Sequence, residues 1–163
     1  MKETSVKLAR DRAREVLVDV DAALTSCEGH LAREAVVRLL NSAVPTYNWV
    51  GIYLVEGDDL VLDAWSGPAA TEHSRIPIGK GVCGFAAKSQ RTEIVSDVGK
   101  DSRYLECFPS TRAEIVVPIL YDGRLVGEID VDGDQLDAFS SLDRELLEAV
   151  ARRLAPDCSA GRL

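Results

Sequence analysis

The chain contains four cysteines, and two of them have surroundings in the sequence that suggest chemistry. Cys83 lies in Gly-Val-Cys-Gly, at the expected start of a short helix, where the helix dipole favours a thiolate. Cys107 lies in Leu-Glu-Cys-Phe-Pro, in a loop expected between two strands. A thiolate at either position can act as a nucleophile, although a free cysteine is more often a small buried hydrophobe. Cys27, in a turn between helices, and Cys158, in a C-terminal tail, fit the structural interpretation.

Three carboxylates stand at positions where strands are expected. Glu114 precedes an apolar run, and Asp130 and Asp132 alternate around Val131, so both aspartates project from one face of a strand. Carboxylates that converge in a pocket repel one another unless a cation, often an ammonium, or a shared proton relieves the repulsion. The alternative is that all three acids are solvated at strand ends, and the spacing alone leaves both interpretations open.

Other motifs do not fit the sites that they resemble. Residues 79–84 match the G-x-G-x-x-G pattern of dinucleotide sites, but Pro77 interrupts the preceding strand and the following helix is too short. Asp130, Asp132 and Asp134 resemble the start of a calcium loop that lacks its glycine and its final glutamate. The chain has two histidines and no close cysteine pair. We therefore expect no metal site and no cofactor.

The elements that hold these residues follow from the spacing of apolar side chains. Helical spacing predicts helices over 6–24, 31–43 and 142–154, the last opened by a capping box at Ser140–Asp143 and ended by Pro156. Extended segments are expected at 48–55, 60–65, 76–78, 93–98, 114–120 and 125–131, with a short helical turn after Gly84. The last two strands form a hairpin across Asp122-Gly123. This order indicates an α+β domain, an antiparallel sheet with helices packed on one face.

Length and charge narrow the class of protein. A chain of 163 residues is long enough for one domain, which we divide into an N-terminal helix (1–27), a core (28–157) and a tail (158–163). The net charge of −8 argues against nucleic acid or an anionic membrane as the main partner. We find no signal peptide, no membrane span and no CxxC pair, so we expect a cytoplasmic location with reduced thiols.

Four segments together resemble the GAF-domain free methionine-(R)-sulfoxide reductases. These segments are Tyr47–Tyr53, Gly79–Gly84, Glu114–Pro118 and Gly127–Asp132, and the similarity covers residues 30 to 155 in the expected order. GAF domains that only bind ligands lack this pair of cysteines. The resemblance implies a single GAF domain with a six-stranded antiparallel sheet, helices behind the sheet and a pocket under the loops.

The resemblance also implies a role for each matching residue. Cys107 corresponds to the catalytic nucleophile and Cys83 to the resolving cysteine. The implied substrate-binding residues are Glu114, Asp130, Asp132, Trp49 and Tyr53. The acids would hold and protonate the substrate, and the aromatic rings would line the pocket around its methyl-sulfoxide end, although from the sequence alone both rings could equally belong to the core.

The implied reaction reduces free methionine-(R)-sulfoxide through a sulfenic acid on Cys107 and then a Cys83–Cys107 disulfide. Thioredoxin is the expected reductant, a homodimer is possible, and the expected setting is oxidative stress. Two features depart from the family: residues 89–93 lack a third cysteine, and Ala113 stands where a serine is common. Two other classes remain open, a GAF module that binds a small molecule for regulation and a dimerisation module built on the first helix.

Overall fold

The computed structural model describes residues 7–160, and the structural statements below refer to that part of the chain. Val6 and residues 161–163 of the expected tail lie outside it. The helices are α1 (Arg10–Ser26), α2 (Gly29–Ala43), α3 (Gly81–Ser89), the 3-10 turn η1 (Val98–Lys100) and α4 (Ser141–Ser159). The strands are β1 (Trp49–Glu56), β2 (Asp59–Ser66), β3 (Arg75–Pro77), β4 (Glu93–Val95), β5 (Ala113–Tyr121) and β6 (Arg124–Gly133).

The strands form one six-stranded sheet in the order β3-β2-β1-β6-β5-β4, and every neighbouring pair is antiparallel. The two longest strands, β5 and β6, form a hairpin across Asp122 and Gly123. Both turn residues have positive φ, 48° and 75°, as a type I′ turn requires. The turn pairs Tyr121 with Arg124, and a bulge between Ile119 and Leu120 then shifts the register for the rest of the hairpin, so the turn and the bulge together decide which residues share a face.

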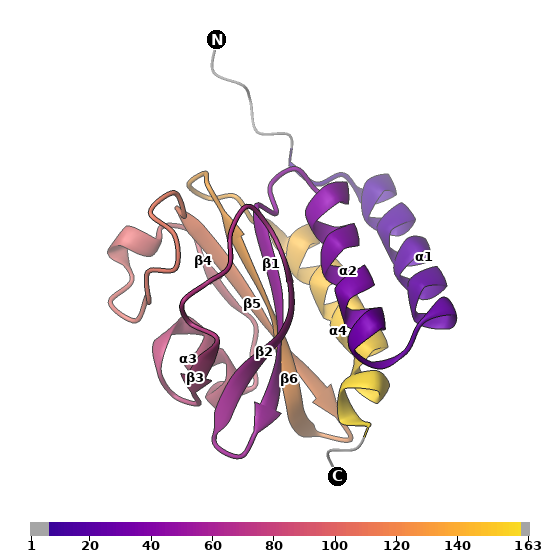
Figure 1. Ribbon diagram of the computed structural model, residues 1–163. Coiled ribbons are helices and arrows are strands. Elements are labelled where there is room, and N and C mark those ends of the chain that lie inside the picture. Colours follow the sequence, from indigo (N-terminus) through magenta and orange to yellow (C-terminus); the bar gives the residue numbers. More distant parts are fainter. Residues whose placement is uncertain (1–6, 161–163) are drawn as a thin grey trace.

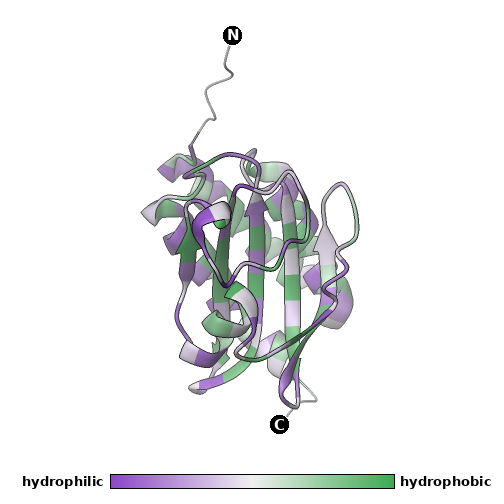
Figure 2. Ribbon diagram, turned by 90° about the vertical axis from the view of Figure 1, so that its left-hand side faces the viewer, coloured by the Kyte–Doolittle hydropathy of each residue, from purple (hydrophilic) through white to green (hydrophobic). Residues whose placement is uncertain are grey.

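The two faces of the sheet carry different coverings. Helices α1, α2 and α4 pack together on one face, and the short helix α3 lies on the other (Figure 1). The strands are banded, with hydrophobic and hydrophilic residues succeeding one another along their length (Figure 2). On β6, Ile129 and Val131 point into the large core beneath the three helices, so the residues between them face α3 and the loops.

A buried arginine joins the helical layer to the sheet. Arg33 of α2 donates to Asp63 of β2 and to Asp157 of α4, with both shorter contacts at 2.6 Å. Asp157 also accepts from the backbone N–H of Gly29, at the start of α2. Because a buried cation is stable only when it is paired, these contacts fix the position of α4 against α2 and the sheet.

The architecture predicted from the sequence is confirmed: the chain folds as an α+β domain with a six-stranded antiparallel sheet. The capping box is present as well, because the side chain of Asp143 accepts from the backbone N–H of Ser140 at 2.7 Å. The described residues include no helix with the length and apolar composition needed to cross a membrane.

Some predicted boundaries are wrong. Pro156 does not end the last helix, which continues to Ser159, and Cys158 is fully buried in that helix instead of lying in a tail. Proline inside a helix costs about 3 kcal/mol. Here the contacts of Asp157 with Arg33 and the burial of Cys158 oppose that cost. The first helix also starts later than predicted, at Arg10, and β4 ends at Val95.

Candidate active site

A row of three acids follows β6 on the face that carries α3. Glu128, Asp130 and Asp132 occupy every second position of the strand, so all three side chains emerge on the same side of the sheet. Glu114 of β5 lies directly opposite Asp132 in the register and adds a fourth carboxyl to the group. All four residues are buried. The predicted convergence of Glu114, Asp130 and Asp132 is therefore present, and the interpretation of these acids as solvated strand ends is wrong.

Burial raises the pKa of every carboxyl in this cluster, because a charged carboxylate loses its hydration there. The charge of Asp130 raises the pKa values of Glu114, Glu128 and Asp132 further. Burial and mutual repulsion therefore favour the protonated forms of these carboxyls. Such a site can donate a proton and would also stabilise a cation placed among the acids.

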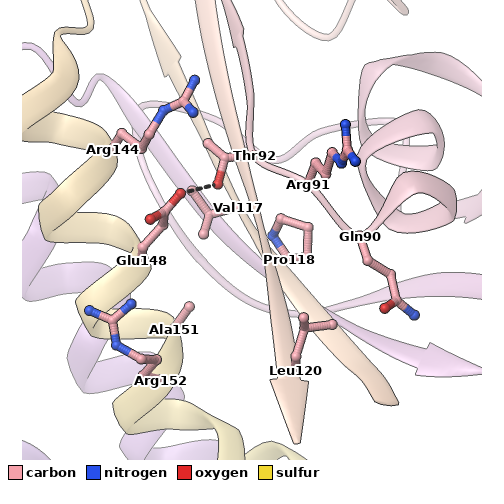
Figure 3. A pocket seen from close by; sticks show the side chains of 10 residues that line it. All are labelled: Gln90, Arg91, Thr92, Val117, Pro118, Leu120, Arg144, Glu148, Ala151 and Arg152. Atoms are coloured by element: carbon pink, nitrogen blue, oxygen red, sulfur yellow. Dashed lines mark hydrogen bonds between the residues drawn. The ribbon is translucent and has the colours of Figure 1, made fainter. Parts of the chain in front are cut away.

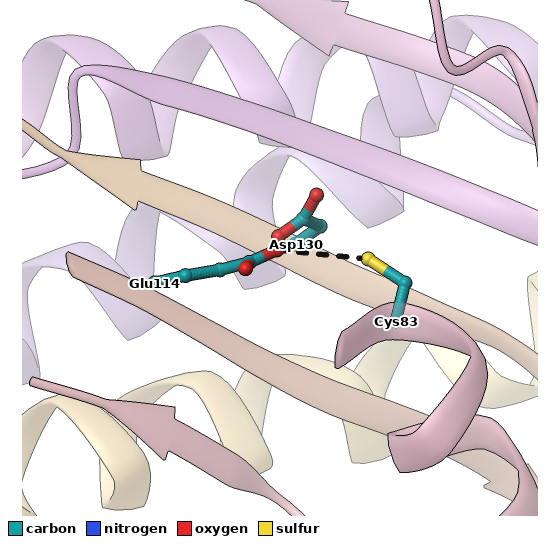
Figure 4. A group of neighbouring side chains, drawn as sticks. All are labelled: Cys83, Glu114 and Asp130. Atoms are coloured by element: carbon teal, nitrogen blue, oxygen red, sulfur yellow. Dashed lines mark hydrogen bonds between the residues drawn. The ribbon is translucent and has the colours of Figure 1, made fainter. Parts of the chain in front are cut away.

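Cys83 is the third residue of α3 and points down onto this cluster (Figure 4). Its thiol donates to Oε1 of Glu114 across 3.7 Å. The helix reaches this depth because residue 84 is glycine: a Cβ at that position would lie 2.6 Å from the carbonyl oxygen of Pro77. Gly84 therefore allows α3 to pack closely against Pro77 of β3.

The electrostatic expectation for Cys83 is wrong. A position in the first turn of a helix favours a thiolate, but the pKa of Cys83 is raised well above its usual value. Burial is the largest cause, and the charges of Asp130, Glu128 and Glu114 follow. Desolvation and three nearby acids raise the pKa of Cys83 by more than the partial positive charge at the N-terminus of a short helix lowers it, so the thiol is protonated in the substrate-free protein.

Cys107 lies in the loop between η1 and β5 and is half-buried. Arg103 fixes one side of this loop through ion pairs with Asp101 and Glu93, at 2.7 and 3.3 Å, and lies over the ring of Phe85 in α3. Burial and the charge of Asp130 raise the pKa of Cys107 to about 12. This thiol is therefore protonated in the substrate-free site too.

Both cysteines line one small cavity. Its other lining residues are His73, Ile76, Val82, Leu105, Glu114 and Asp130. The cavity measures about 10 Å³, which holds one water molecule at most and is far below the roughly 300 Å³ at which small-molecule pockets begin. The site is thus closed in this structure, and a substrate of amino-acid size requires the loop that carries Cys107 to move.

The two aromatic residues predicted for the site lie on its face of the sheet but do not line this cavity. Trp49 is buried between Trp65 and Phe108, with ring centroids 6.5 and 5.9 Å away, and donates to the carbonyl oxygen of Ala69. Tyr53 is fully buried and donates to the carbonyl oxygen of His73 at 2.9 Å. Each aromatic residue therefore supports a loop around the site.

Two residues near the site, Glu128 and His73, were not among the site residues predicted from the sequence. The side chain of Glu128 is fully buried and contacts the thiol of Cys83. The same two-residue alternation that singles out Asp130 and Asp132 extends to it. His73 carried no local signal, and its Nε2 lies 3.1 Å from the carbonyl oxygen of Glu106 in the Cys107 loop.

Larger cavities lie elsewhere and contain neither cysteine. One of about 610 Å³ lies on the outer side of the Cys107 loop, beside Tyr104 and Phe108. Another, of about 520 Å³, lies between α4 and the edge of β5, where Arg144 and Arg152 surround Glu148 (Figure 3). Size alone would favour these cavities, but only the small one brings thiols and acids together.

Comparison with known proteins agrees with this geometry. Residues 30–156 match the GAF domain family, and the chain belongs to that family. It is 38% identical over 115 residues to the free methionine-R-sulfoxide reductase of Saccharomyces cerevisiae, a match that covers 68% of this chain and 63% of the yeast protein. The enzyme of the same name from Escherichia coli is 32% identical over 116 residues, 71% of this chain and 69% of that protein.

A solved structure extends the match to almost the whole chain. The free methionine-R-sulfoxide reductase of Neisseria meningitidis, determined in complex with its substrate, superposes with a TM-score of 0.85 at 34% identity. The superposition covers 98% of this chain and 97% of the other. Within the GAF domains, this chain is a member of the free methionine-R-sulfoxide reductase family.

Proposed function

We propose that the protein reduces free methionine-(R)-sulfoxide to methionine, with Cys107 as the nucleophile and Cys83 as the resolving cysteine. The observation that supports this most directly is the shared cavity, in which both thiols meet Glu114 and Asp130. A free amino acid carries an α-ammonium that can pair with these carboxylates, whereas a methionine inside a peptide has no such cation. The acids therefore favour the free substrate.

In the first step the sulfur of Cys107 attacks the sulfoxide sulfur. A protonated carboxyl donates to the sulfoxide oxygen, and burial raises the pKa values of Glu114 and Asp132, which favours the protonated form that such a donor needs. The oxygen passes to Cys107 as a sulfenic acid, and the proton of the Cys107 thiol replaces the one that the carboxyl gave up. Methionine leaves with its sulfur reduced by two electrons.

In the second step the thiol of Cys83 condenses with the sulfenic acid, which forms a disulfide and releases water. Glu114 is placed to accept the proton of Cys83, because its Oε1 already accepts a hydrogen bond from that thiol. Glu114 then passes this proton to the departing hydroxyl, which leaves as water. An external dithiol, for which we propose thioredoxin, then reduces the disulfide.

A substrate comparison tests the function. The reduced protein is supplied with thioredoxin, its reductase and NADPH, and the oxidation of NADPH is followed with four substrates. These are the R and S epimers of free methionine sulfoxide and the N-acetylated form of each epimer. We expect turnover of the free R epimer and at most a few per cent of that rate for the other three. Equal rates on free and N-acetylated R epimer would contradict the role of the ammonium, and absence of turnover would favour a ligand-binding GAF domain.

A further inference from the structure

Three potential metal-ligand atoms converge in the site. Sγ of Cys83, a carboxylate oxygen of Glu114 and a carboxylate oxygen of Asp130 all lie within 4.8 Å of one another, and all three residues are buried. They come from α3, β5 and β6, and their ends point toward one another (Figure 4). The wide separation of residues 83, 114 and 130 in the sequence hides this group from any search for a local metal motif.

A second observation points to a bound cation. Oδ1 of Asp130, a residue that is 2% exposed, is buried without a hydrogen-bond partner among the described residues. An unpaired buried oxygen costs free energy, and native proteins leave few such atoms. A cation held between Cys83 and Asp130 would interact favourably with this oxygen.

We propose that the reduced protein binds one Zn²⁺ through Cys83, Glu114 and Asp130, and that the bound ion blocks sulfoxide reduction. The binding rests on the geometry alone, and the inhibition rests on the function proposed above. Zinc bonds of about 2.3 Å to sulfur and about 2.1 Å to oxygen separate the donors of a tetrahedral site by about 3.5 Å. Sγ of Cys83 and Oε1 of Glu114 are 3.7 Å apart before any movement.

The donor types select the ion. A thiolate ligand favours Zn²⁺ over Mg²⁺ and Ca²⁺, which prefer oxygen ligands alone. The ion displaces the proton of the Cys83 thiol and those held by the carboxyls, and these protons pass to solvent without any electron transfer. The fourth position is open to water or to Cys107, which lines the same cavity.

The proposed site is incompatible with two states of the catalytic cycle. The ion needs the carboxylates that would pair with the substrate ammonium, so zinc and substrate compete. The disulfide consumes the thiol of Cys83, so oxidation releases the ion. Zinc would therefore occupy only reduced, substrate-free protein, in which it would protect both thiols from other oxidants.

Metal titration tests the binding without reference to activity. Full-length protein is reduced, treated with a chelator that is then removed, and titrated with Zn²⁺ against a competing dye and with Co²⁺ as a spectroscopic probe. We expect one Zn²⁺ per chain, a thiolate-to-cobalt charge-transfer band, and no competition from excess Mg²⁺ or Ca²⁺. Cys83→Ser should abolish the band and weaken zinc binding at least tenfold, and free methionine should weaken it in the wild type.

Two further variants make the outcome decisive. Asp130→Asn keeps both thiols and should also weaken zinc binding at least tenfold, whereas Cys27→Ser, a half-buried cysteine at the end of α1, should bind as the wild type does. Circular dichroism checks that each variant is folded. Failure of the wild type to bind one zinc ion, or unchanged affinity in either Cys83→Ser or Asp130→Asn, would overturn the site. Activity measured without zinc is independent of this result, so a failure of the proposed function would be recognised separately.

Discussion

At the scale of single residues, the two thiols lie among acids, which oppose the formation of a thiolate. Burial and the charge of Asp130 raise the pKa of Cys107 to about 12, and the pKa of Cys83 is raised as well. In the proposed reaction the substrate ammonium offsets the negative charge that opposes the thiolate. Binding of the correct substrate would therefore also activate the nucleophile that attacks it.

Neutral variants of the acids test this role. Glu114→Gln and Asp132→Asn each remove a charge and a transferable proton but keep the shape of the side chain. We expect kcat/KM for the free R epimer to fall by about 10² in each variant, the lower range for loss of an acid catalyst. The control is Asp134→Asn, which changes an exposed acid two residues beyond Asp132 and should leave the rate unchanged.

Far-ultraviolet circular dichroism and thermal unfolding show whether the variants remain folded. We expect Glu114→Gln and Asp132→Asn to unfold cooperatively, because both acids already have raised pKa values and a neutral amide resembles the protonated form. Wild-type kinetics in both variants would remove these acids from the mechanism.

At the scale of elements, the loop that carries Cys107 forms one wall of the closed cavity. Its contacts come from different parts of the chain: Arg103 with Glu93 of β4, Glu106 with His73, and Phe108 with Trp49 of β1. None of these three contacts is a backbone hydrogen bond between paired strands, so the loop can open without disturbing the sheet. We expect it to open for substrate and to close around it.

Removal of one of these contacts should affect catalysis more than stability. Arg103→Ala deletes partly exposed ion pairs, whose loss costs about 1 kcal/mol or less. We expect kcat/KM to fall about tenfold, because Cys107 is then positioned less well for attack. Arg153→Ala is a matched control, since Arg153 is similarly exposed but pairs with Asp21 on the helical face. Equal losses of activity in the two variants would show that the Arg103 contacts have no special role.

The sequence predicted elements better than it predicted their contacts. Alternation over 128–132 and the Asp122-Gly123 turn are local signals, so the hairpin and its row of acids were predictable. The depth of α3 depends on its approach to Pro77, and the length of α4 depends on the pairing of Asp157 with Arg33. These contacts join residues far apart in the chain, and periodicity does not encode them.

At the scale of the whole molecule, the sheet separates the large apolar core from the acids and thiols of the proposed site. The face under α1, α2 and α4 holds the large apolar core, whereas the opposite face buries four acids whose pKa values are raised. An acid with a raised pKa binds a proton in the folded state at pH values where the unfolded chain has already released it. By linkage, the free energy of unfolding must then decrease as the pH rises above the unfolded values, 4.5 for glutamate and 3.8 for aspartate.

The pH dependence of stability provides a test. We expect the free energy of unfolding of the wild type, measured with urea, to decrease from pH 5 to pH 9. Glu128→Gln should make this decrease shallower by up to about 1.4 kcal/mol per pH unit, since one buried acid no longer has to retain a proton. The exposed Glu145→Gln serves as the control. Identical slopes in wild type and Glu128→Gln would mean that Glu128 does not retain a proton in the folded state.

The central claim is that Cys107 attacks the sulfoxide and Cys83 resolves the product, and a single-turnover experiment with two cysteine variants tests it most directly. Each reduced protein is mixed with excess free methionine-(R)-sulfoxide without any reductant, and the methionine released is measured per protein. Cys83→Ser should release about one methionine and retain a sulfenic acid on Cys107, which dimedone traps for mass spectrometry. Cys107→Ser should release none, because a hydroxyl lacks the nucleophilicity of a thiolate. The wild type should release one methionine and contain a Cys83–Cys107 disulfide; normal release by Cys107→Ser, or a wild type without that disulfide, would contradict the account.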